Sequence, residues 1–134
     1  MRVFADAFFY LALMNRRDEH HARVRAWTNT FDGEIVTSQW VLTEVADAFA
    51  ESHGRRGLRG WFATIVEDNG TRVIPVSSRY FDRGLELYDA RPDKEWSLTD
   101  CISFIIMKEE GLTDALTGDR HFEQAGFRAL LTDS

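Results

Sequence analysis

The segment Val3-Phe4-Ala5-Asp6-Ala7-Phe8-Phe9 places an acidic residue between two apolar runs near the amino terminus. The first run has the pattern of a short buried strand, expected over Arg2–Ala5, and the second opens a helix expected over Ala7–Met14. Asp6 therefore stands at the carboxyl end of a strand, which is where open α/β sheets bind ligands. The same position is also an ordinary helix N-cap, so Asp6 gains significance only if other acids lie near it.

Composition limits the class of protein. The chain has 134 residues, 44% of them hydrophobic, and its ten Phe and four Trp can build the core of one domain, expected over residues 1–134. No apolar run is long enough to span a bilayer and the amino terminus lacks a secretory signal, so we expect a cytoplasmic protein without membrane contacts. The single Cys101 indicates neither a disulfide nor a zinc site. The net charge of -6 argues against nonspecific electrostatic binding of nucleic acid over the whole surface, so any contact with nucleic acid must be local.

Strand-like and helix-like segments alternate through the rest of the chain. Short apolar runs predict the strands, and apolar residues spaced three and four apart predict the helices. This alternation is typical of an α/β fold, and we expect a single domain with a central parallel sheet flanked by helices on both faces. The further strands are expected at residues 34–37, 72–76, 115–117 and 127–131, and the further helices at 19–30, 39–52, 55–68, 79–88, 98–110 and 120–124.

Three helix ends carry recognisable signals. Ser38 stands at the N-cap of the helix expected at 39–52, and Ser97-Leu98-Thr99-Asp100 has the spacing of a capping box. Gly111 is placed to end the helix that this box begins, in a left-handed turn. These signals predict where two of the helices begin and where one of them ends.

Four acids occupy positions from which they can meet at one edge of the sheet. Asp6 follows the first strand and Asp119 follows the fourth, so both lie at the carboxyl edge of a parallel sheet. Asp100 begins the helix that leads into the fourth strand, and Glu44 lies early in the helix that follows the second. Both helices can approach the same edge from their sides.

Each acid also has an ordinary structural explanation. Asp6 and Asp119 can serve as N-caps, and Asp100 as the acidic third position of a capping box, where it also meets the helix dipole favourably. Glu44 belongs to a polar helical stripe beside an apolar one, so it is either solvated or at the border of a cleft. The polar stripe comprises Trp40, Glu44, Asp47 and Glu51, and the apolar stripe comprises Val41, Val45, Ala48 and Phe49.

A cluster of carboxylates needs a cation. Four negative groups at one edge would repel one another at neutral pH. Mg²⁺ or Mn²⁺ suits a site made of oxygen ligands, and a water bound there can attack a phosphodiester. If the acids meet, the chemistry that they indicate is metal-assisted hydrolysis, for which no Ser, Cys or His nucleophile is required.

Four segments share the features of one known family. An apolar strand ends in Asp in VFADAFFYLAL, a helical Glu follows the second strand in SQWVLTEVADAF, and the third acid stands in SLTDCISFIIMKEEGL. The fourth segment, ALTGDRHFEQAGF, carries Thr, any residue, Asp, a basic pair, Phe and then Gly before the final strand. Together they cover nearly the whole chain, which resembles the PIN-domain ribonucleases and in particular the VapC-like toxins of bacterial toxin–antitoxin pairs.

The resemblance implies a function and a site. Members of this family hydrolyse RNA at an acidic pocket that holds Mg²⁺ or Mn²⁺, many are toxins, and many form dimers. By that analogy the chain is a metal-dependent endoribonuclease with an RNA substrate, an antitoxin partner and a homodimeric state. The antitoxin would present a basic segment to the acidic groove and an apolar helix to a surface between helices. The catalytic and metal-binding residues would be Asp6, Glu44, Asp100 and Asp119, with Thr117 as a supporting hydroxyl.

Ala7 departs from the family pattern, which usually has Thr or Ser after the first Asp. Loss of such a hydroxyl can weaken a metal site roughly tenfold or more, so the alternative hypothesis is a PIN-like scaffold that binds RNA or a protein without cutting. Thr117 can likewise be an ordinary β-branched strand residue. Among the histidines, His121 stands beside Asp119 and is placed to contact substrate, whereas Asp114 precedes its strand and is expected at the opposite edge.

Overall fold

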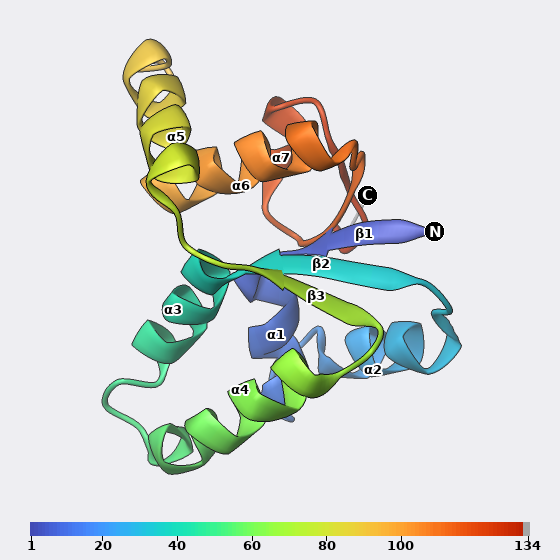
Figure 1. The fold of residues 1–134 in the computed structure, drawn as a ribbon. Helices are drawn as coiled ribbons and strands as arrows, with labels where there is room; N and C mark the ends of the chain where they lie inside the picture. The colour runs from blue at the N-terminus through green and yellow to red at the C-terminus, as the bar shows by residue number, and fades with distance from the viewer. Residues whose placement is uncertain (133–134) are drawn as a thin grey trace.

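The central sheet is built around β1 (Arg2–Ala5), the strand that leads into Asp6. The structure, a computed structural model, describes residues 1–132, and within this range the strands form one parallel sheet in the order β3-β2-β1-β4-β5. Val3, Phe4 and Ala5 are fully buried, because helices cover both faces of the sheet (Figure 1). The other strands are β2 (Glu34–Ser38), β3 (Thr71–Ile74), β4 (Asp114–Leu116) and β5 (Arg128–Ala129).

Two layers of helices enclose the sheet. One lies below it and the other above it in the view of Figure 1, which confirms the predicted α/β architecture. No helix within residues 1–132 is both long enough and apolar enough to cross a membrane. The lower layer comprises α1 (Ala7–Met14), α2 (His21–Thr30), α3 (Gln39–Ala48) and α4 (Leu58–Glu67), and the upper layer comprises α5 (Ser78–Ala90), α6 (Leu98–Glu110) and α7 (Arg120–Gln124).

The largest difference from the predicted elements lies between α3 and α4. Helix α3 ends at Ala48 instead of continuing to residue 52, and α4 begins at Leu58 instead of residue 55. A short 3-10 helix, η1 (His53–Gly57), lies between them. Gly54 and Gly57 lower the helix propensity of this stretch, which accounts for the break.

Several strand ends also differ from the prediction by a few residues. Strand β3 ends at Ile74, because Pro75 has no N–H to continue the ladder. Thr117 lies just after β4 and not within it, and the strand expected at 127–131 is limited to the two residues of β5. Residues 133–134, which complete the expected domain, lie outside the described range.

The helix signals read from the sequence are present in the structure. The Ser38 side chain accepts a hydrogen bond from the backbone N–H of Val41 at the start of α3. Ser97 and Asp100 form both hydrogen bonds of the capping box that begins α6. Gly111 ends α6 with a φ of 71°, a left-handed conformation that glycine adopts without strain.

The order of the strands places a switch point at β1. From β1 the chain runs outward through β2 and β3, and it then returns to add β4 and β5 on the other side. The helices that follow β1 and β4 consequently leave the sheet in opposite directions, which opens a crevice at the carboxyl end of β1. Asp6 lies at that point.

Candidate active site at the carboxyl edge of the sheet

The four acids proposed from the sequence come from four separate parts of the chain and lie at the carboxyl edge of the sheet. Asp6 follows β1, Asp119 follows β4, Glu44 lies in α3, and Asp100 lies in the first turn of α6. Charge interactions connect Asp6 with Asp100 and Asp119. Glu44 interacts with all three. The structure therefore brings together all four side chains that the sequence proposes as a set.

Asp6 is almost fully buried, with 6% of its surface exposed. The Thr117 hydroxyl donates a hydrogen bond of 2.9 Å to Oδ2 of Asp6, and the backbone N–H of Ala7 donates another. The pKa of Asp6 is raised to about 6, mainly by burial and in part by the charges of Asp100 and Asp119, while the two hydrogen bonds lower it. A cation bound beside Asp6 would favour its ionised form.

Thr117 connects the ends of β1 and β4. It is fully buried, and its Oγ1 accepts a hydrogen bond of 3.0 Å from the backbone N–H of Asp119 while it donates one to Asp6. A single hydroxyl thus contacts both acids of the neighbouring strand ends. Ala7 offers no hydroxyl at this position, and the side-chain hydrogen bond to Asp6 comes from Thr117 instead.

Asp100 and Asp119 converge on the imidazole of His121. Nδ1 of His121 lies 3.0 Å from Oδ2 of Asp100 and 3.5 Å from Oδ1 of Asp119. Both acids also have their ordinary capping roles, because Asp100 accepts from the backbone of Ser97 and Asp119 accepts from the backbone of His121. One ligand atom from each of Asp100, Asp119 and His121 lies within 4.8 Å of the others, a spacing that can hold a metal ion.

Glu44 completes the cluster from the side of α3. Its Oε1 is buried and has no hydrogen-bond partner among residues 1–132, so it is not the solvated surface group that its polar stripe allows. Burial and, to a smaller extent, the charges of neighbouring carboxylates together raise the pKa of Glu44 to about 7. The adjacent stripe is apolar as predicted, with Val41 and Val45 fully buried.

The cluster fits a divalent cation. Its carboxylate oxygens are the ligands that Mg²⁺ and Mn²⁺ prefer, and the buried Oε1 of Glu44, which has no hydrogen-bond partner among the described residues, can serve as one of them. The charge interactions that raise the pKa of Asp6 and Glu44 come from other carboxylates, so a cation would relieve the repulsion at both.

His121 contacts two of the four acids, which the sequence did not predict. Its position beside Asp119 indicated only a contact with substrate, whereas its contact with Asp100 spans 21 residues of sequence and depends on the packing of α7 against α6. Asp114 begins β4 at the end opposite to Asp119, as predicted.

A family comparison covers the whole of this site. Residues 3–128 match the family model of the PIN domain, a range that includes every acid of the cluster. The chain belongs to the PIN-domain family. This membership confirms the resemblance seen in the sequence.

Similar proteins agree with the family and the fold. The 23S rRNA-specific endonuclease VapC20 of Mycobacterium tuberculosis is 27% identical over 125 residues, which cover 93% of this chain and 95% of that protein. The crystal structure of VapC20, described as a sarcin-ricin loop cleaving toxin, matches with a TM-score of 0.84 at 26% identity over 93% of this chain and 95% of the other. FitAcB from Neisseria gonorrhoeae shares the fold, with a TM-score of 0.70 at 14% identity over 96% of each chain.

Proposed function

We propose that this PIN-domain protein is a metal-dependent endoribonuclease that hydrolyses phosphodiester bonds of RNA. The proposal is carried by the convergence of four carboxylates at one edge of the sheet, where the buried Oε1 of Glu44 lacks a hydrogen-bond partner within the described residues. The similarity to VapC20, a 23S rRNA-specific endonuclease, supports RNA as the substrate class. The four residues are Asp6, Glu44, Asp100 and Asp119.

Each element of the site has a distinct task in this proposal. Mg²⁺ or Mn²⁺, when held by the four carboxylates, supplies an activated water and neutralises charge on the phosphate. Asp6 and Asp119 present oxygens from neighbouring strand ends, and the Thr117 hydroxyl donates to the Asp6 carboxylate while it accepts from the Asp119 backbone. Glu44 and Asp100 approach from α3 and α6 and would supply further oxygen ligands.

A test of this function compares RNA cleavage by the wild type and by Asp100→Asn. We expect the wild type to cleave single-stranded RNA with Mg²⁺ or Mn²⁺ and not with EDTA, and the variant to lose most of this activity. Asn keeps an oxygen that can accept the hydrogen bond from Ser97, so the capping box is retained. Gel analysis of end-labelled RNA measures the effect. Equal cleavage by both proteins excludes this site, and binding without cleavage favours the scaffold alternative that Ala7 motivates.

We also propose that the protein is the toxin of a toxin–antitoxin pair and that it consists of a single PIN-like domain. The matched VapC20 structure is described as that of a toxin, which supports this assignment. The carboxylate edge is acidic, and a basic segment of an antitoxin would complement it. Co-expression with the product of a small adjacent gene tests the pairing, because an antitoxin is expected to co-purify and to inhibit cleavage.

A homodimer formed through α5 is the oligomeric state that we propose. Phe81, Leu85 and Tyr88 are 42%, 43% and 49% exposed and recur along one face of this helix. Such an exposed apolar stripe is typical of a protein contact. Sedimentation equilibrium is expected to give a dimer for the wild type and for Glu86→Gln, and a monomer for Phe81→Glu. A monomeric wild type would contradict the proposal.

A further inference from the structure

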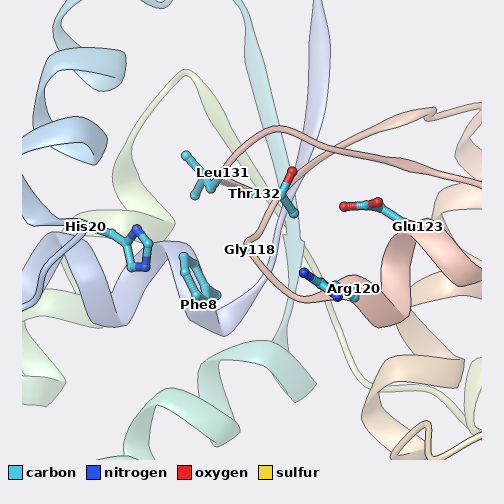
Figure 2. A pocket seen from close by; sticks show the side chains of 7 residues that line it. All are labelled: Phe8, His20, Gly118, Arg120, Glu123, Leu131 and Thr132. Carbon is cyan, nitrogen blue, oxygen red and sulfur yellow. The ribbon is translucent and has the colours of Figure 1, made fainter. Parts of the chain in front are cut away.

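A cavity of about 340 Å³ lies beside the carboxylate cluster. Figure 2 shows its walls: Phe8 and His20 from the side of α1, Leu131 from the end of the chain, and Arg120 and Glu123 from α7. Gly118 lies on the floor between the two sides. None of the roles assigned to the carboxylate cluster uses this cavity.

The cavity is joined to the cluster through its aromatic wall. Phe8 lies two residues after Asp6, and Gly118 separates Thr117 from Asp119. A Cβ at residue 118 would lie 2.5 Å from Cζ of Phe8, so the ring packs directly on the backbone that carries Asp119. A molecule held against Phe8 is therefore next to the carboxylates.

The two sides of the cavity differ in chemistry. Phe8 and His20 form an aromatic side, with ring centroids 5.0 Å apart, and Leu131 extends this side with apolar surface. Arg120 is exposed on the opposite side and forms no ion pair among residues 1–132. An aromatic side of two rings inclined by 52° facing an unpaired guanidinium suits a group that combines a π-face with polar edges and a negative charge.

A nucleotide of single-stranded RNA has this combination of properties. Bases of any sequence stack on aromatic side chains, and Arg contacts phosphate or the polar edge of a base. The net charge of -6 makes local contacts of this kind necessary for RNA to bind near an acidic site. A basic protein segment would be attracted by Glu123 but repelled by Arg120, so it suits the cavity less well than a nucleotide, which can use both Phe8 and Arg120.

We propose that this cavity is a nucleotide-binding subsite that holds one base of a single-stranded RNA next to the scissile phosphate. The base lies against Phe8 and His20, and Arg120 contacts its edge or the adjoining phosphate. The assignment rests on the proposed ribonuclease function. A base held in this subsite would fix which phosphodiester bond of the RNA lies next to the carboxylates.

Kinetics of Arg120→Ala and His20→Ala test the subsite. Loss of a base contact is expected to raise KM for a short single-stranded RNA by about tenfold with kcat nearly unchanged. Arg128→Ala is the matched control for Arg120, because Arg128 is an exposed arginine of the same terminal segment that pairs with Asp114 in the sheet register, at the other end of β4. His53→Ala, in the exposed turn η1, is the control for His20. Both controls are expected to keep the wild-type KM.

An RNA with one abasic nucleotide beside the cleaved bond separates base recognition from charge. Its KM with the wild type is expected to rise by about the same factor, and the His20→Ala protein is expected to show no further rise. An unchanged KM for both subsite variants, in a wild type that does cleave RNA, overturns the subsite and leaves the ribonuclease function standing. A wild type without cleavage removes the ribonuclease function itself. Arg120→Ala also tests the other occupant. If this variant binds RNA as the wild type does but binds an oligo-arginine peptide more tightly, the cavity is a site for a basic protein segment and the nucleotide subsite is overturned.

Discussion

Replacing Asp119 by Asn is expected to reduce metal-dependent RNA cleavage by roughly a hundredfold or more, because one charged ligand of the proposed site is lost. The same replacement at Asp114 is expected to leave cleavage nearly unchanged. Both acids lie close to β4, but Asp114 begins the strand and Asp119 follows its carboxyl end. The pair therefore compares the same chemical change at two ends of one element.

The structure also explains why Asp119→Asn should fold. Asp119 caps α7 by accepting a hydrogen bond of 2.9 Å from the backbone N–H of His121. Asn is as good an N-cap as Asp, so the helix start is retained while the charge is removed. Single-turnover cleavage rates in Mn²⁺ measure the effect, and matching thermal unfolding curves confirm that both variants are folded. Comparable rates for the two variants would show that the carboxyl edge is not the catalytic centre.

Asp6→Asn is expected to be more stable than the wild type in EDTA above pH 7. Burial raises the pKa of Asp6 to about 6 in the folded protein, from a value of 3.8 that serves as the unfolded reference. Between these values the folded state binds more protons than the unfolded state, so the free energy of unfolding falls as pH rises from about 4 to about 6. Above that window the ionised side chain costs about 2 to 3 kcal/mol, and Asn does not carry this cost.

Urea denaturation at several pH values measures this difference. In EDTA the variant and the wild type should have similar stability near pH 4, and the variant should gain about 2 to 3 kcal/mol over the wild type at pH 8. Mn²⁺ should then stabilise the wild type, because it binds the folded state, and should stabilise the variant much less. Asp114→Asn serves as the control and should show neither effect. A variant that is less stable than the wild type at pH 8 would mean that ionised Asp6 is compensated within the protein itself.

The local features of this fold were predictable from the sequence. Caps depend on residues three positions apart, so the spacing of Ser97 and Asp100 was enough to place the start of α6. Apolar runs separated by helical patterns predicted the parallel sheet, and the strand-to-helix position of Asp6 predicted its edge of the sheet. The break between α3 and α4 was predicted, but as two residues only, because the sequence has no clear end signal after Ala48 and no clear start signal before Leu58.

The sequence by itself determined the succession of strands and helices along the chain and the four acids proposed for the site, because both follow from short-range patterns. Only the tertiary structure decided that these acids meet. The hydroxyl of Thr117 reaches Asp6 across 111 residues, and His121 reaches Asp100 only when α7 packs beside α6. Contacts of this kind depend on how the strands are ordered in the sheet, which no local spacing specifies. The raised pKa of Asp6 and the cavity beside Phe8 arise in the same way, since burial and shape exist only after the chain has packed.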